Sequence, residues 1–93
     1  MSKEEYVLGT AIKITTILNR TATSVTIAIR TPSGVLAVNE ASMSSETDEV
    51  YSYIYQSSNS NPEGEYIARI TATDGSYNGV EEVTFYLRKQ AWS

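Results

Sequence analysis

Apolar and polar residues alternate in short runs along this chain, and these runs predict β-strands. The longest run covers residues 66–73, where Tyr66, Ala68, Ile70 and Ala72 share one face and mostly polar side chains occupy the other. A period of two is typical of a strand that buries one of its faces. Turn-forming residues stand on both sides of the run and set its ends.

The same pattern predicts further strands. They are expected at residues 6–8, 11–18, 25–30, 35–38, 50–56 and 80–88, with a short edge strand near residues 42–44. The alternation breaks near the end of the second of these runs, which predicts either a bulge near Thr15-Thr16 or a stretch that is buried on both faces. Residues 57–61 are predicted to be a flexible linker, and residues 74–79 a six-residue loop.

About seven or eight short strands with frequent turn signals predict an all-β fold built as an antiparallel sandwich. The pattern contains no helix and no internal repeat. The core is expected to include the inward-facing residues Ile27, Ile29, Tyr66, Ile70, Phe85 and Leu87.

The segment Glu63-Gly64-Glu65-Tyr66, with its tyrosine at the head of a long strand, resembles the tyrosine-corner region of immunoglobulin-like sandwiches. Together with the aromatic strand before it and the last strand ending near Phe85, it resembles bacterial and archaeal immunoglobulin-like modules. Such modules occur in surface adhesins, secreted multidomain proteins and some virion proteins. The resemblance covers the second half of the chain and implies an immunoglobulin-like sandwich. The antibody-type pair of cysteines is absent, because the chain has no cysteine.

The length of the chain indicates how many domains it forms, and its charge indicates which partners it is unsuited to bind. Ninety-three residues suit a single domain spanning residues 1–93, with residues 1–5 and 89–93 as flexible or interface tails. The net charge of −4 and the pI near 4.6 argue against nucleic acid or an anionic membrane as the main partner. Both of those partners need clustered cations, and the seven Lys and Arg residues are scattered.

The sequence also carries expectations about location. No apolar run approaches the ~20 residues that cross a bilayer, so no membrane insertion is expected. The first residues lack the basic-then-apolar form of a signal peptide. We therefore expect a soluble chain. It would belong to a virion or the cytoplasm if the chain is complete, and to the cell surface or medium if it is part of a larger secreted protein.

The chain contains neither histidine nor cysteine. This removes the usual nucleophile and base pairs, as well as the usual zinc ligands, so no catalytic residue, metal or cofactor is expected. A carboxylate pair of the glycosidase type stays formally open, since eleven Asp and Glu residues are present. None of them follows an apolar strand in a way that predicts a raised pKa, and the chain is not expected to be an enzyme.

Residues 74–79 supply oxygen ligands in a predicted loop and resemble the spacing of a calcium loop. The closing bidentate glutamate is missing at the required distance. A turn containing Asp and Asn is therefore favoured, and a calcium-stabilised repeat is the weakest of three functional hypotheses.

The three tyrosines on one face of residues 50–56 form the most suggestive functional pattern. Tyr51, Tyr53 and Tyr55 have two readings. As exposed rings they would stack on sugars or anchor a protein, because tyrosine combines a large rigid surface with a hydroxyl group. As the inner face of the strand they would belong to the core, which is the favoured reading.

Contact residues are also expected at loops and at the chain end. Tyr77 and Asn78 lie in the last predicted loop, and Trp92 is either a lid over one end of the core or an anchor for a neighbouring subunit. The predicted function is a non-enzymatic immunoglobulin-like structural or binding module of a larger surface or virion assembly. A protein partner or self-association is expected. The alternative is a carbohydrate-binding module that uses Tyr51, Tyr53 and Tyr55.

Overall fold

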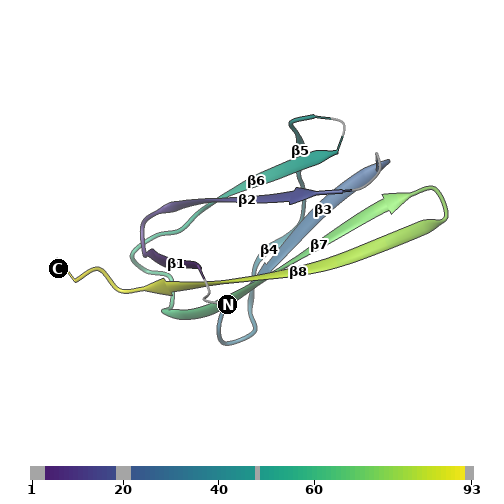
Figure 1. Cartoon of the computed structure of the whole chain (residues 1–93). Coiled ribbons are helices and arrows are strands. Elements are labelled where there is room, and N and C mark those ends of the chain that lie inside the picture. Colours follow the sequence, from purple (N-terminus) through teal and green to yellow (C-terminus); the bar gives the residue numbers. More distant parts are fainter. Residues whose placement is uncertain (1–3, 19–21, 48, 92–93) are drawn as a thin grey trace.

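The structure is a computed structural model that describes residues 4–18, 22–47 and 49–91, without the side chains of Glu4 and Tyr77. Eight strands make up its regular structure (Figure 1). They are β1 (Glu4–Val7), β2 (Ala11–Ile17), β3 (Ser24–Arg30), β4 (Leu36–Ser42), β5 (Ser44–Ser45), β6 (Val50–Gln56), β7 (Gly64–Asp74) and β8 (Tyr77–Arg88). Within the described ranges, no helix is long and apolar enough to cross a membrane.

The strands form two sheets. The five-stranded sheet has the order β1-β8-β7-β3-β4, and the three-stranded sheet has the order β2-β6-β5. β1 pairs with β8 in parallel, and the other pairs of described strands are antiparallel. The predicted all-β immunoglobulin-like sandwich is therefore confirmed. β1 begins at Glu4, two residues earlier than predicted.

The chain passes from one sheet to the other between β1 and β2, between β2 and β3, between β4 and β5, and between β6 and β7. The first crossing passes through Gly9, whose φ of 100° favours glycine. The buried hydroxyl of Ser57 accepts a hydrogen bond from Gly9 N at 3.0 Å and donates one to Thr10 O at 2.7 Å. The prediction of a flexible linker from residue 57 is thus wrong for Ser57, because this hydroxyl satisfies two backbone groups at the crossing.

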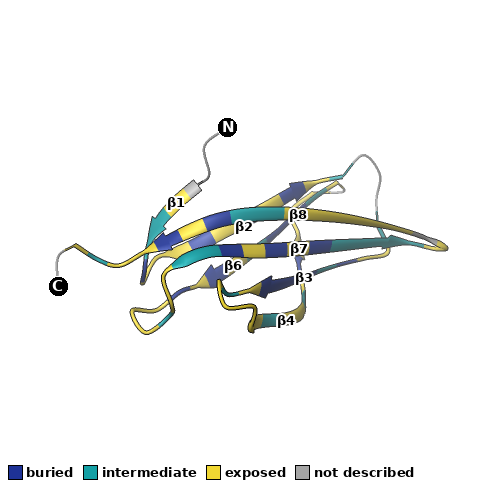
Figure 2. Ribbon diagram, turned by 90° about the horizontal axis from the view of Figure 1, so that it is seen from below, coloured by how far each residue is buried: buried dark blue, intermediate teal, exposed yellow. Residues whose placement is uncertain are grey.

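The core lies between the sheets. All six residues predicted for it are at most 2% exposed: Ile27, Ile29, Tyr66, Ile70, Phe85 and Leu87. Figure 2 shows buried and exposed residues alternating along β7, as the sequence pattern predicts. At one end of the core the rings of Tyr66 and Phe85 are stacked, with centroids 5.4 Å apart. The ring centroids of Tyr6 and Tyr55 each lie 6.4 Å from that of Phe85.

β2 is regular over its whole length, so the predicted bulge at Thr15-Thr16 is wrong. The strand pairs with β6 without a shift in register, and its burial alternates from Ala11 to Ile17. Thr16 takes the inward position and is 3% exposed, whereas Ile17 points outward and is 76% exposed. The hydropathy pattern gave a wrong prediction here because a threonine occupies a core position and an isoleucine occupies a surface position.

β7 and β8 form a long hairpin with a two-residue turn, so the predicted six-residue loop at residues 74–79 is wrong. Asp74 pairs with Tyr77, and only Gly75 and Ser76 connect the strands. Gly75 has a φ of 62° and holds the first central position, which suits a type II′ turn. The end of the hairpin projects beyond the three-stranded sheet (Figure 1).

The region before β7 has the geometry of a tyrosine corner. The Tyr66 hydroxyl donates a hydrogen bond to the carbonyl oxygen of Pro62 at 2.6 Å, which confirms this part of the sequence interpretation. Burial of the ring, and then the neighbouring Tyr55, raises the pKa of Tyr66 to about 12. The corner therefore holds a neutral hydroxyl that fixes the turn to the start of the strand.

We expect Tyr66→Phe to lower the free energy of unfolding by about 1 kcal/mol, because the carbonyl of Pro62 loses its donor. Urea unfolding at pH 7 measures this change. A raised folded pKa means that the contribution of the neutral hydroxyl is complete below pH 10.0 and is lost as the pH rises through about 12. The variant should lack this part of the alkaline loss. Equal stability of both proteins at pH 7 would contradict the role of the hydrogen bond.

Candidate functional site

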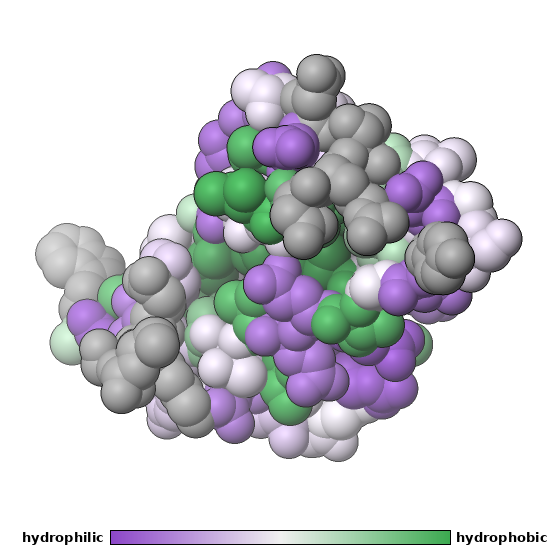
Figure 3. All heavy atoms as spheres, turned by 45° about the vertical axis from the view of Figure 1, so that its right-hand side comes forward, coloured by the Kyte–Doolittle hydropathy of each residue, from purple (hydrophilic) through white to green (hydrophobic). Residues whose placement is uncertain are grey.

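An apolar groove opens where the hairpin extends past the end of β2. It has a volume of about 340 Å³ and is lined by residues 16–18 of β2 and the segment after it, Ile70 and Ala72 of β7, and residues 79–81 of β8. Figure 3, with this end of the molecule turned forward, shows hydrophobic surface among hydrophilic side chains. The groove lies between β2, which is an edge strand of the three-stranded sheet, and the β7–β8 hairpin of the five-stranded sheet.

Small residues create the hollow. Ala72 and Gly79 are paired across the hairpin, and an added Cβ at Gly79 would meet no atom within 4 Å. The paired strands β2 and β6 end at Ile17 and Val50, and the hairpin extends past this end of their sheet (Figure 1). The two most exposed aliphatic side chains at the rim are Ile17 and Val80, at 76% and 64%.

One hydrogen bond connects the two walls of the groove. The buried hydroxyl of Thr16 donates to Oε1 of Glu81 at 2.6 Å. Glu81 pairs with the buried Ile70 and therefore lies on the inner face of its sheet, although it is exposed. An inward-pointing charge on an edge strand disfavours pairing with any strand that lacks a complementary charge.

The edge of β8 is free of a partner strand over residues 77–84 among the described residues, because β1 pairs only with Phe85 to Arg88. The direction of its backbone groups follows from one bond. Leu8 N donates to Arg88 O at 2.9 Å, so Arg88 points its backbone groups toward β1. The β7–β8 register has no shift, and backbone direction alternates along a strand. The backbone N–H and C=O groups therefore point away from β7 at Asn78, Val80, Glu82 and Thr84.

The remaining long edges differ from this one. β4 has two register shifts against β3, and Glu40 within it has a φ of 56°, so this edge is irregular. β2 is regular, but Lys13 lies on it, and lysine is a residue that protects edges. Of the long edges in the described part of the chain, only the free part of β8, residues 77–84, combines a regular backbone with two glutamates and no cation.

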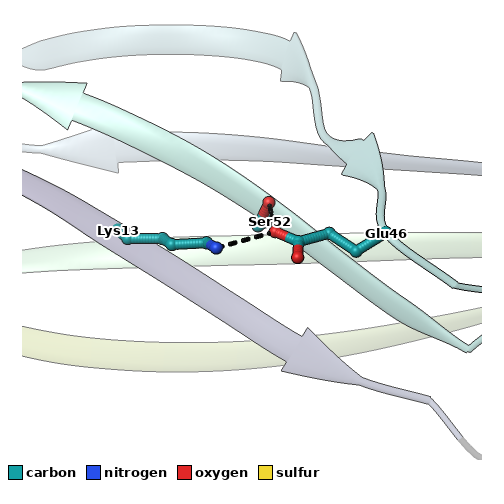
Figure 4. Close-up of polar contacts among 3 residues, drawn as sticks. All are labelled: Lys13, Glu46 and Ser52. Carbon is teal, nitrogen blue, oxygen red and sulfur yellow. Dashed lines mark hydrogen bonds and ion pairs between the residues drawn. The ribbon is translucent and has the colours of Figure 1, made fainter.

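A polar cluster lies on the outer face of the three-stranded sheet (Figure 4). Glu46 forms an ion pair with Lys13, at 2.9 Å between Nζ and Oε2, and accepts a hydrogen bond from the Ser52 hydroxyl. The Ser52 hydroxyl, and then the Lys13 ammonium, hold the pKa of Glu46 below its usual value of 4.5. The cluster ties the segment after β5 to both long strands of the sheet, which is a structural role.

We expect Ser52→Ala to raise the pKa of Glu46 toward its ordinary value, because the hydroxyl is the main cause of the lowering. A titration of the Glu46 carboxyl carbon by NMR measures it. A lowered folded pKa means that the contribution to stability is present above about pH 4.5 and is lost as the pH falls through the folded pKa. Ser44→Ala, on the strand beside Ser52, is the control and should leave the pKa unchanged.

The core interpretation of the β6 tyrosines, which the sequence favours, is confirmed for two of them, and the alternative of an exposed platform is wrong for these two. Tyr51 and Tyr55 are 8% and 7% exposed and belong to the core, and Tyr53 is half-buried against it. All three face inward, since each pairs with an inward residue of β2. Sugars cannot stack on rings that the opposite sheet covers, so the carbohydrate hypothesis loses its platform.

The structure places two of the predicted contact residues near the groove and does not describe the third. The backbone of Tyr77 and the exposed Asn78 lie at the start of β8, next to the groove residues. Trp92 lies outside the described residues. The sequence interpretation missed Thr16, Gly79 and Glu81. The sequence did contain a signal for Glu81. In a strand with a period of two, residue 81 falls on the same inward face as Val83, Phe85 and Leu87.

The lining of the groove is mainly apolar and carries few polar side chains. It contains one carboxylate, one hydroxyl and apolar groups. Among the described residues, no group of three acidic side chains is placed to hold a metal ion. The calcium hypothesis required a loop at residues 74–79, and these residues form a tight hairpin instead. The arrangement suits binding of an apolar or extended chain.

We expect Gly79→Ala to raise the free energy of unfolding by about 0.5 to 1 kcal/mol, because alanine reduces the freedom of the unfolded chain and its Cβ enters open space. Thermal unfolding measures the change. Gly75→Ala is the matched control: its Cβ also meets nothing, but its φ is 62°. That variant should be less stable than the wild type, and equal effects at both positions would contradict the argument.

One comparison with known structures informs the fold. The crystal structure of CopC from Methylosinus trichosporium OB3b superimposes with a TM-score of 0.71 over 97% of this chain and 87% of that chain, at 10% sequence identity. This similarity supports the β-sandwich and, at such low identity, carries no function. No protein-family model and no curated protein sequence matches the chain.

Proposed function

We propose that this chain is a non-enzymatic β-sandwich module that binds another protein through its open side, within a larger surface or virion assembly. The open side consists of the free edge of β8 and the groove beside it. The observation that carries the proposal is the regular β8 edge, whose backbone groups at Val80 and Glu82 face away from β7 next to exposed apolar side chains. The lack of histidine and cysteine supports a role without catalysis.

The proposed contact surface keeps part of the surface that the sequence predicted and leaves out the rest. Asn78 and the backbone of Tyr77 remain in the contact region, because both begin the strand that forms the edge. The three tyrosines of β6 are not included, since two of them are buried. An exposed apolar rim around a hollow is typical of a surface that becomes covered by a partner.

Site-specific photocrosslinking tests the proposal in the native source. A photoreactive phenylalanine analogue replaces Val80 in one variant and Val35 in another. The two valines are matched controls, because they are 64% and 62% exposed but only Val80 lies at the groove. We expect one discrete crosslinked species from position 80 and none from position 35. Identical patterns from both positions, or none from either, would overturn the proposal.

A further inference from the structure

We propose that the free edge of β8 takes up an extended, cationic segment of another chain as an additional strand of the five-stranded sheet. This inference rests on the proposed binding role of the open side and specifies its ligand. The segment would lie beside residues 77–84, next to the position that β1 occupies along Phe85 to Arg88. Its backbone would pair with Asn78, Val80, Glu82 and Thr84.

β1 shows that this edge accepts a strand. It pairs with the last residues of β8 in parallel and leaves the rest of the same regular edge without a partner among the described residues. An added strand would therefore continue an interface that the protein already uses. Main-chain hydrogen bonds supply the affinity in this mode of recognition, and alternate side chains supply the specificity.

The charges at the site select a cationic segment. An added strand places every second side chain on the inner face, beside Glu81 and opposite the end of β2. A lysine or arginine there would form a charge-assisted hydrogen bond with the carboxylate, which has room for further donors besides the Thr16 hydroxyl. Among the described residues, no lysine or arginine forms an ion pair with Glu81. The net charge of −4 favours the same kind of ligand.

The remaining side chains of the added strand, which alternate with those beside Glu81, would lie on the outer face beside Val80. This valine is 64% exposed, so an apolar side chain next to it would bury surface that is otherwise in water. The expected ligand therefore alternates basic and apolar residues over about eight positions, the length of the free edge.

A second copy of this chain fits the edge less well. Two β8 edges that paired with each other would bring Glu81 and Glu82 of both copies close together, and like charges across neighbouring strands are unfavourable. The edge of β2, which faces the same groove, carries Lys13 and is unsuited to a cationic strand. The charge pattern thus favours a different chain at β8.

The experiment selects peptides from a random library of ten residues displayed on phage, with the 93-residue chain as bait. We expect enrichment of alternating sequences with lysine or arginine. Synthetic copies of the selected peptides are then methylated on every second backbone nitrogen, in either phase. One phase should weaken the Kd at least about tenfold and the other should change it little, because only one phase faces β8. Equal effects of both phases, or a failure to enrich any peptide, would overturn the inference.

Variants of the protein locate the binding strand. Val80→Pro removes an N–H that points away from β7, so the hairpin keeps its ladder while peptide binding should fall at least about tenfold. Val80→Ala retains the N–H and loses only the apolar contact, so it should weaken binding less than Val80→Pro. Glu81→Gln should weaken binding about fivefold at low salt, and Glu82→Gln, which faces Arg69 in the register, should weaken it less.

The two proposals fail in different ways. Peptides that bind regardless of Val80→Pro but are lost in Gly79→Leu, which fills the groove, would overturn strand addition and retain the open side as the binding surface. Peptides that ignore both variants, together with no crosslink from position 80, would overturn both. A dimer in sedimentation that Val80→Pro dissociates would show that a second copy is the occupant, which contradicts the cationic ligand.

Discussion

Phe85→Ala is expected to lower the free energy of unfolding by about 3 to 5 kcal/mol. Phe85 is 2% exposed and lies among three other rings, those of Tyr6, Tyr55 and Tyr66. Removing it leaves a cavity between the sheets that rigid aromatic neighbours cannot fill. Domains of this size have a total stability of about 5 to 15 kcal/mol, so much of the margin would disappear.

Thermal unfolding followed by near-UV circular dichroism measures this effect. A change of 1 kcal/mol shifts the Tm of a small domain by about 4 to 8 °C, so a decrease of at least about 12 °C is expected. Tyr86→Ala is the matched control, because Tyr86 is the next residue on the same strand and is 38% exposed on the outer face. A similar loss in both variants would show that the two faces of β8 are assigned incorrectly.

Gly64→Ala should have the second largest effect, a loss of about 2 to 4 kcal/mol. Gly64 begins β7 with a φ of 131°, a region that essentially only glycine occupies. A Cβ at this position would also lie 2.7 Å from Cγ and 2.9 Å from Cβ of Pro32 in the turn between β3 and β4. Backbone strain and steric overlap therefore act together.

Gly34→Ala separates these two causes. Gly34 has a φ of 91°, but an added Cβ would meet no atom within 4 Å. We expect this variant to lose only the backbone contribution, about 1 to 2 kcal/mol. Chemical denaturation of both variants measures the difference. If Gly64→Ala cost no more than Gly34→Ala, the close approach of Pro32 would have no energetic weight.

The strands themselves were predictable because their signal is local. Alternation along residues 66–73 and 25–30 identifies both the strand and its inward face, and the structure buries Ile27, Ile70 and Tyr66 accordingly. The tyrosine corner was also within reach, since the donor and its acceptor at Pro62 are four residues apart. Such features depend on neighbours in the sequence and need no knowledge of the partner strands.

Errors arose where a residue's environment is set by a distant segment. Thr16 is buried because its hydroxyl finds a carboxylate 65 residues later in the chain, at Glu81. Ser57 is buried because it satisfies the backbone at the first crossing between the sheets, near Gly9. Hydropathy assigns both residues to the surface, and only the folded chain shows which polar groups acquire partners.

By itself, the sequence determined an all-β chain, its inward faces, its acidic charge and its lack of the residues most often used in catalysis. Only the tertiary structure decided that β8 is an edge, that β1 covers just its final residues, and that a groove lies where β2 ends. The physical reason is that alternation specifies which side of a strand is buried, whereas the order of strands in a sheet depends on pairing between segments far apart in the chain.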